Sequence, residues 1–466
     1  MSPAPPRTVA KRVYDVAIIG PDVGGAAAAA LCARRGLRTL LAPLQAVGAA
    51  RESDGWLLPG AHPMIPPLRH LSAAVGPLEE MGLGADLQRL GATAQGSFQI
   101  LGEKLRLSLP ADPARRKGEL RRELSDVGAS EADAAIAALE RLGHAWDEFL
   151  RSPPPWPPRG FFEKRRVRKM IPPPPPLPEG LIGDCLQALA PFAASLVDDS
   201  AHEATAREAA ALFRSPLRMW GGAAQLGELM REKAVASGGD VIAGAAEELR
   251  LERKQVHFKL GGSDVTASCV VLACGAERIG ALVQGGARAE RKIAEEASLP
   301  VQRKVTLAHY VVRGEGLPQA LEEAALLLGH PMGPLVISAQ PARRARGETA
   351  GERVVTVARV SDAGFSDAEG LLTSIRNALE PVLPFFDRHV LHQAADLNPL
   401  QPHTILHPHE DADPIGLRAT SEGHERVLFA SEATYPGFGL EGQILAARVA
   451  AEQALAMSGR KTVSAT

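Results

Sequence analysis

The first candidate for chemistry is a glycine-rich turn at residues 20–25, which reads GPDVGG. It follows an apolar run at residues 13–20 and opens an alanine-rich stretch at residues 23–35. A buried strand, a glycine turn and a helix N-terminus together form an anion site, because the helix amides and the helix dipole attract phosphate. The pattern therefore predicts a site for the diphosphate of a dinucleotide.

This turn departs from the full G-x-G-x-x-G pattern at the positions that would meet the ligand. The first and third glycines stand at Gly20 and Gly25, but the second is Asp22. At the end of the next strand, where a carboxylate would bind the ribose hydroxyls, the residue is Pro43. Two unit charges ~4 Å apart repel by roughly 4 kcal/mol at an effective dielectric of ~20, which is about a thousandfold in affinity.

Asp22 also suits a different role. Aspartate is a favoured helix N-cap, and its charge would satisfy the dipole that a diphosphate would otherwise meet. A carboxylate supplied by the protein would then stabilise an empty fold. The residues alone leave both a weakened or altered cofactor site and an empty one open.

Four further blocks follow this turn along the chain. They are VGAAR with DGW and GAH at residues 47–62, WGGAAQL at 220–226, a strand–turn–strand block at 240–276, and ASEATYPGFGLEG at 430–442. Together with the N-terminal turn, they resemble the phytoene desaturase and amine oxidase branch of the FAD-dependent oxidoreductases, with a degenerate FAD fingerprint. The matches lie at both ends and in the middle of the chain, in the family's order.

The resemblance implies an α/β fold with a Rossmann-type FAD/NAD(P)-binding domain and an inserted α+β substrate domain. We expect residues 13–75, 215–290 and 400–457 to form the discontinuous FAD-binding-type domain. Residues 76–214 and 291–399 are expected to form the substrate or cap domain.

The same resemblance implies which residues face FAD. In the family, the acidic residue that matches Glu432 holds the cofactor's linker, and the following helix N-terminus faces the flavin. The cofactor-binding candidates are Gly20, Asp22, Gly24, Gly25, Pro43, Arg51, Gly221, Gly222, Glu432, Gly437, Gly439 and Gly442.

The sequence assigns no catalytic residue, and it offers two pocket candidates. His62 lies where the family's chain passes near the flavin, and its alternative is a turn histidine bonded to backbone. Tyr435 lies at the expected flavin edge, and its alternative is a core aromatic under the last helix. Oxidation by flavin needs few titratable side chains because the hydride goes to the cofactor.

The composition of the chain limits which ligands and which cellular location we expect. The 466-residue chain has a formal net charge of −2, which gives no reason to expect nucleic acid. Residues 1–12 lack the apolar core of a signal peptide, and no stretch reaches the length of a transmembrane helix. We therefore expect a cytoplasmic protein, with any membrane contact peripheral. The four cysteines are expected to be small buried hydrophobes: Cys32, Cys185, Cys269 and Cys274.

One proline-rich basic segment, residues 153–178, is expected to be a loop, and residues 1–12 and 458–466 to be flexible tails. Five prolines at 172–176 exclude helix and sheet there. The segment could rest on an anionic membrane surface, dock a protein partner, or be a solvated loop. The residues that would make the contact are Trp156, Phe161, Phe162, Arg165, Arg166 and Arg168.

A histidine-rich stretch near the C-terminal third suggests a metal, but prolines interrupt it and no helical spacing aligns its side chains. Its members are His403, His407, His409, Glu410 and Asp413. We expect no metal site. Two functions remain open: an FAD-dependent oxidoreductase acting on an apolar, isoprenoid or carotenoid substrate, and a non-catalytic relative that has lost FAD and serves as a binding or scaffold protein.

Overall fold

The computed structural model describes most of the chain. The described residues are 12–43, 50–65, 68, 72–90, 92–93, 98–110, 112–170, 179–193, 207, 210–211, 217–283, 287–299, 301–398, 405–406 and 416–459. The histidine-rich stretch, the prolines at 172–176, both expected tails apart from Arg12, Ser458 and Gly459, and the VGA of the VGAAR block lie outside them.

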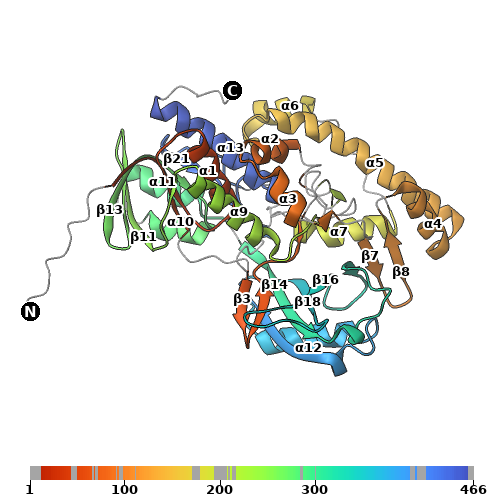
Figure 1. The fold of residues 1–466 in the computed structure, drawn as a ribbon. Coiled ribbons are helices and arrows are strands. Elements are labelled where there is room, and N and C mark those ends of the chain that lie inside the picture. The colour runs from red at the N-terminus through yellow and green to blue at the C-terminus, as the bar shows by residue number, and fades with distance from the viewer. Residues whose placement is uncertain are drawn as a thin grey trace, which may run out of the picture.

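Two large sheets organise the molecule (Figure 1). The first contains β1 (Arg12–Ile19), β2 (Thr39–Ala42), β10 (Asp240–Val241), β11 (Ala246–Leu251), β12 (Val256–Leu260), β13 (Ser263–Leu272) and β21 (Val427–Phe429). The second contains β7 (Phe98–Leu101), β8 (Arg106–Leu109), β14 (Val301–Val312), β15 (Ala324–Leu327), β16 (Leu335–Pro341), β18 (Arg353–Asp362), β19 (Val390–Asp396) and β20 (Ile405–Leu406).

The small sheets join segments that are distant in sequence. One contains β3 (Ala50–Ser53), β4 (Trp56–Pro59) and β17 (Arg343–Arg344), and the other β5 (Met64–Ile65), β6 (Ala92–Thr93) and β9 (Leu217–Arg218). Because β4 pairs with β17, part of the expected N-terminal segment 13–75 is bonded to a strand from the expected insertion 291–399.

The helices surround these sheets. They are α1 (Val23–Arg34), α2 (Ser72–Glu80), α3 (Gly84–Leu90), α4 (Pro113–Glu123), α5 (Asp126–Arg151), α6 (Gly160–Met170), α7 (Leu181–Ala193), α9 (Gly222–Ala236), α10 (Ala276–Leu282), α11 (Arg288–Glu296), α12 (Ala368–Leu379) and α13 (Gly439–Ser458). Within the described residues, each of them is too short or too polar to cross a bilayer.

The first sheet has a parallel centre, in the order β10-β2-β1-β13, with β21 parallel to the end of β13. Its N-terminal unit β1–α1–β2 forms where the sequence predicts it. Helix α1 is an alanine-rich helix buried on nearly every side, since it packs between α9 and α13 as well as on the sheet. Both ends of the chain therefore contribute to one core.

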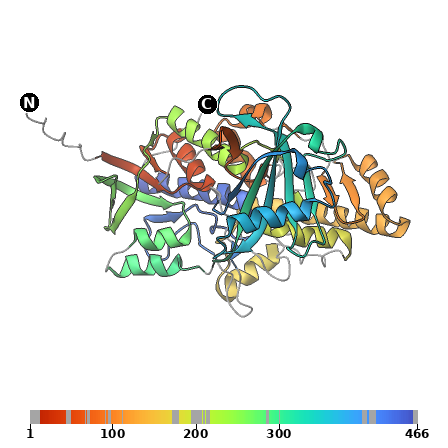
Figure 2. The same cartoon turned by 90° about the horizontal axis from the view of Figure 1, so that it is seen from below.

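The second sheet has apolar side chains on both faces. Leu371, Ile375 and Leu379 of α12 pack on one face (Figure 2), and residues of α4, α5 and α7 pack on the other. Strands β14 and β18 contain the apolar runs at 305–312 and 353–359 and extend beyond them, and α12 covers residues 368–379. All four cysteines are buried, as predicted.

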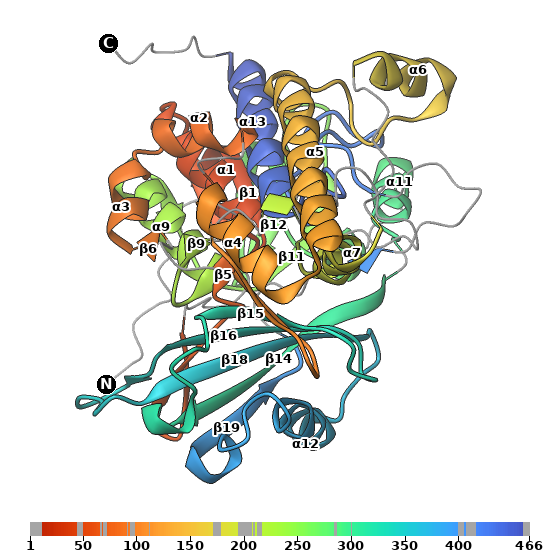
Figure 3. The same ribbon diagram turned by 90° about the vertical axis from the view of Figure 1, so that its right-hand side faces the viewer.

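Helix α6 corrects the sequence-based expectation for residues 153–178. The segment contains a helix from Gly160 to Met170, because these eleven residues include no proline and several good helix formers. Figure 3 shows α6 at the edge of the molecule, far from the second sheet.

Candidate functional site

The glycine turn lies at the carboxyl end of β1, beside the end of β13. Gly20 has a φ of 138°, and a Cβ there would lie 1.9 Å from the carbonyl oxygen of Ala273. A Cβ on Gly24 would lie 2.1 Å from the carbonyl oxygen of Ala430, and one on Gly25 would lie 2.6 Å from the Cβ of Ala273. The chain's own packing therefore requires glycine at all three positions.

Asp22 occupies the N-cap position of α1 as predicted, but the predicted cap by its side chain is wrong. Its side chain makes no bond to the amides of α1. Oδ2 instead accepts a hydrogen bond from the backbone N–H of Glu432, 3.3 Å away and 410 residues later in the chain. The carboxyl thus connects the N-terminal turn to the loop after β21.

The environment of Asp22 favours its neutral form. Burial, followed by the negative charge of Glu432, raises the pKa of Asp22 to about 8, although the N–H of Glu432 and the charge of Arg278 act in the opposite direction. The carboxyl is therefore mostly protonated at neutral pH. The repulsion calculated from the sequence assumed an ionised Asp22, and it applies in full only above pH 8.

A second side chain accepts a hydrogen bond from the N-terminus of α1. The N–H of Gly24 donates to Oε1 of Gln443, a buried residue of α13, over 3.3 Å. Sequence reasoning missed Gln443, and the only available signal was its position directly after the last glycine of the C-terminal motif. Two groups from the chain's far end, Gln443 and the Glu432 amide, thus meet the turn.

Pro43 and Arg51 occupy the positions expected near the adenosine half. Pro43 is buried after β2 and has no side-chain acceptor for a hydroxyl group. Arg51 is directed toward β19, where it donates to the carbonyl of Ala395 over 3.1 Å and lies 3.9 Å from Asp396. Both of these partners belong to the second sheet.

The glycine pair before α9 lies beside His62. Gly222 has a φ of 57°, and a Cβ there would lie 2.1 Å from the carbonyl oxygen of His62. Gly221 donates its N–H to the side chain of Gln225, 3.2 Å away. The predicted pocket residue His62 and the predicted pair Gly221 and Gly222 are thus brought together across 160 residues of sequence.

His309 is a neighbour of His62 that sequence reasoning missed. It is buried in β14, and its Nδ1 lies 3.0 Å from the hydroxyl of Thr356. Burial, helped by the charges of Arg51 and His62, lowers the pKa of His309 to about 3. The imidazole is therefore neutral, and its only signal in the sequence was a histidine within an apolar strand.

The C-terminal motif reaches α13 through unusual backbone angles. Tyr435, Gly437 and Gly439 have φ values of 58°, 88° and 45°. Gly442 donates its N–H to the carbonyl of Phe438, and a Cβ on Gly442 would lie 2.8 Å from the carbonyl oxygen of Tyr435. The backbone is folded tightly on itself, and Tyr435 holds a left-handed conformation that non-glycine residues rarely adopt.

Tyr435 lies in the apolar core, next to an aromatic cluster formed by Trp146, Phe149, Trp156 and Phe438. Burial raises the pKa of Tyr435 to about 12. This placement matches its alternative interpretation as a core aromatic. Trp156 is also buried and donates Nε1–H to the carbonyl of Pro436 over 3.2 Å, which corrects its expected role as a surface contact.

Beneath the first turn of α13 lies a buried ionic group. Glu441 is fully buried, accepts the N–H of Ala73 at 2.8 Å, and pairs with Arg207. Arg207 also binds Asp147 of α5 at 2.5 Å. Glu441 and Arg207 are buried and paired, Asp147 is half-buried, and the group connects α13 to α2 and α5.

The site frame fits the diphosphate of a dinucleotide when Asp22 is protonated. The strand, the glycine turn and the helix N-terminus are present, and a neutral carboxyl can donate a hydrogen bond to a phosphate oxygen. Among the described residues, no group of three or more histidine, cysteine or acidic side chains is arranged to hold a metal ion.

Comparisons with known proteins place this geometry in a known fold. Neither protein-family models nor curated proteins match the chain. Among solved structures, cyclohexylamine oxidase from Brevibacterium oxydans IH-35A matches with a TM-score of 0.58 at 14% identity, covering 96% of this chain and 99% of that chain. Putrescine oxidase bound to putrescine matches with a TM-score of 0.56 at 15% identity, covering 97% and 100%.

A third solved structure, an oxidoreductase from Methanosarcina mazei, matches with a TM-score of 0.56 at 14% identity, covering 94% of this chain and 99% of that chain. At such identities the likeness concerns the fold alone. The predicted fold class is confirmed: an α/β Rossmann-type domain with an inserted α+β domain, a fold shared with the solved cyclohexylamine oxidase and putrescine oxidase.

Proposed function

We propose that this protein is an FAD-dependent oxidoreductase that oxidises an apolar substrate. One observation carries the proposal: the glycine turn and the C-terminal motif meet across the length of the chain. The contacts are Asp22 with the amide of Glu432 and Gly24 with Gln443. The amine oxidase architecture over nearly the whole chain supports the same assignment.

Different residues of the chain would contact the two halves of FAD. The turn at 20–25 and the N-terminus of α1 would hold the diphosphate, with Asp22 as a neutral donor. Glu432 would hold the linker, and the backbone at 437–442 would lie along the flavin. When bound, FAD accepts the hydride that the substrate loses.

The proposed substrate class is apolar, with isoprenoids and carotenoids as the resemblance implies. His309, which lies near His62, is neutral, so it offers no charge to attract an ionic substrate. The charge of Arg51, which also acts on His309, lies 3.9 Å from Asp396. Cyclohexylamine and putrescine, after which two structural neighbours are named, serve as the contrasting amine substrates.

A second candidate function has a specific observation in its favour. Asp22 and Gln443 already accept hydrogen bonds from two amides at the place where a diphosphate would bind. A non-catalytic relative that keeps the fold as a binding or scaffold protein would have such a turn, in which the protein itself supplies the hydrogen-bond partners.

FAD content decides between the two functions. The purified protein is denatured and the released flavin is measured, and the apoprotein is titrated with FAD while flavin fluorescence is followed. Released FAD, or saturable uptake, supports the oxidoreductase. A colourless protein that takes up no FAD even in excess overturns it.

Substrate class is tested on the FAD-loaded protein without oxygen. A polyene isoprenoid, cyclohexylamine and putrescine are each added, and bleaching of the flavin absorbance is recorded. We expect bleaching by the isoprenoid. Bleaching by the amines alone would replace the apolar substrate with an amine while leaving the oxidoreductase assignment intact.

A further inference from the structure

The outer face of α6 combines exposed aromatic and basic side chains. Phe161 and Phe162 are 70% and 84% exposed and pack edge to face, with ring centroids 5.7 Å apart. Two adjacent phenylalanines at one helix start form an exposed apolar site of a kind that monomeric proteins use for contacts.

Helix α6 has a narrow half-buried side and a broad exposed side. Glu163, Lys164 and Val167 are half-buried and face the body of the molecule, at the spacing expected for one helix face. The exposed side chains are Phe161, Phe162, Arg165, Arg166, Arg168, Lys169 and Met170. The outer face thus carries four cations and no acidic group.

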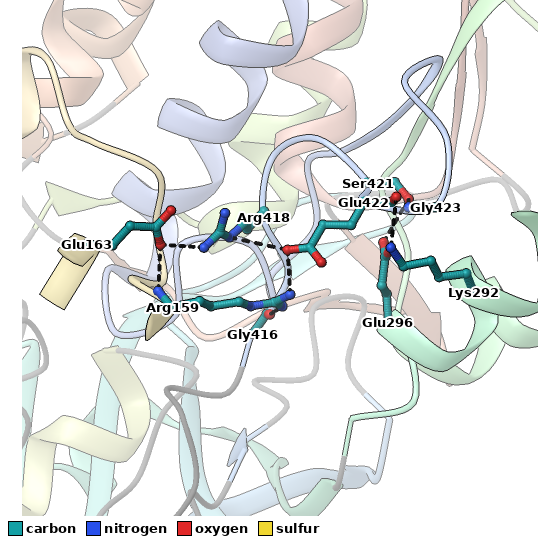
Figure 4. Close-up of polar contacts among 9 residues, drawn as sticks. All are labelled: Arg159, Glu163, Lys292, Glu296, Gly416, Arg418, Ser421, Glu422 and Gly423. Carbon is teal, nitrogen blue, oxygen red and sulfur yellow. Dashed lines mark hydrogen bonds and ion pairs between the residues drawn. The ribbon is translucent and has the colours of Figure 1, made fainter. Parts of the chain in front are cut away.

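An ionic network fixes the base of this helix (Figure 4). Glu163 accepts the backbone N–H of Arg159 at 2.7 Å and binds Arg418 at 2.6 Å. Arg159 also binds Glu422 at 2.8 Å and donates to the carbonyl of Gly416 at 3.3 Å. The two acidic groups near α6 are therefore neutralised by arginines from outside its outer face.

The network continues to α11. Lys292 of α11 donates to the carbonyl of Glu422 at 3.1 Å, and Ser421 donates to Glu296 at 2.7 Å (Figure 4). On the other side, buried Trp156 holds the chain just before α6. An eleven-residue helix is marginal in water by itself, so these contacts give α6 a fixed position on the molecule.

We propose that the outer face of α6 binds the surface of an anionic lipid bilayer. The chain as a whole has a formal net charge of −2, so the four cations on one short helix face are a local concentration of positive charge. Phenylalanines at an interfacial helix enter the boundary between headgroups and acyl chains, while flanking cations attract anionic headgroups.

The shape of the site favours a bilayer over an acidic protein. In Figure 3, α6 stands out at the periphery as a single convex element. A flat, deformable surface accepts such a projection together with its two aromatic side chains. The inference does not depend on FAD or on the proposed oxidation.

The test is flotation of the purified full chain with vesicles of phosphatidylcholine alone and of phosphatidylcholine mixed with phosphatidylserine. We expect binding to the mixed vesicles only, weakened by added salt because exposed charges are screened. Phe161→Ser with Phe162→Ser, and separately Arg165→Gln with Arg166→Gln, should each reduce binding at least tenfold.

The matched control is Arg115→Gln with Lys117→Gln, which removes two exposed cations from α4. It should bind the mixed vesicles as the unchanged protein does. Because α6 contributes no fully buried side chain, all variants should keep the wild-type thermal transition. Absence of binding to mixed vesicles overturns the proposal, as does equal loss in the α4 control. Binding to polyglutamate but not to vesicles also overturns it and identifies an acidic protein partner instead.

Discussion

The glycine turn at residues 20–25 and the glycine segment at 435–442 lie at opposite ends of the sequence and meet in one site, yet their local structures differ. At the first, side chains from the protein accept hydrogen bonds where a diphosphate would bind. At the second, three positive φ angles persist, one of them at a tyrosine. Close packing requires glycine at the turn, whereas the C-terminal segment is set apart by its left-handed backbone positions.

The largest effect expected from this comparison is at Gly24. Gly24→Ala would place a Cβ 2.1 Å from a backbone oxygen, so the two segments must separate. We expect a loss of at least about 3 kcal/mol in the free energy of unfolding, measured by urea denaturation. Gly275→Ala, at an exposed glycine with φ −58° and no atom near its Cβ, is the control and should change stability little. Equal effects of both substitutions would show that packing does not fix Gly24.

The next effect concerns FAD itself. Asp22→Gly combined with Pro43→Glu removes the carboxyl at the turn and restores an acceptor for ribose hydroxyls. At pH 9, where Asp22 is ionised, we expect FAD to bind about a hundredfold more tightly, or roughly 2.7 kcal/mol. Fluorescence titration measures the change. An unchanged affinity would falsify the hypothesis that Asp22 and Pro43 weaken the binding of the adenosine half of FAD.

A smaller effect links Asp22 to pH. Because its folded pKa lies above its value of 3.8 in the unfolded chain, the carboxyl destabilises the fold increasingly as pH rises from about 4 to 8, and fully above 8. Asp22→Asn should therefore raise stability at pH 9 by about 2 kcal/mol, and far less at pH 5.

The measurement for Asp22→Asn is the thermal transition at both pH values. Asp184→Asn is the control, because that residue lies on α7 away from the turn. If Asp22→Asn changes stability equally at pH 5 and pH 9, the carboxyl is already ionised at pH 5 and the proposed protonated state is wrong.

The smallest effect belongs to the C-terminal segment. Gly437 has a φ of 88°, so Gly437→Ala should cost about 1 kcal/mol in stability through backbone strain. If the segment serves FAD, the same variant should also weaken FAD binding, and the fluorescence titration reports it. Lower stability with unaltered FAD affinity would mean that the conformation at 437 serves only the fold.

Local patterns predicted the fold because they depend on neighbouring residues. The β1–α1–β2 unit and the strands within the insertion follow from apolar runs and glycine turns. The resemblance also placed both chain ends in one domain, and α1 does pack against α13. Helix α6 was missed because the prolines on either side dominated the composition of the segment.

Long-range partners could not be predicted from the same patterns. Asp22 looked like a helix cap because caps are local, but its partner is an amide 410 residues away. Trp156 looked like a surface anchor beside basic residues, but Pro436 and Phe438 provide a buried place for it. Such pairs depend on how distant segments meet, which no spacing in this single sequence records.

The burial of α1 has a consequence for how the chain is made. Helix α1 leaves the ribosome early, but α13, which covers one of its apolar sides, begins only at Gly439. At typical synthesis rates, that interval lasts on the order of half a minute. During this time the alanine-rich helix lacks the cover that α13 gives it in the folded chain, so the apolar side that α13 covers stays exposed until α13 has been made.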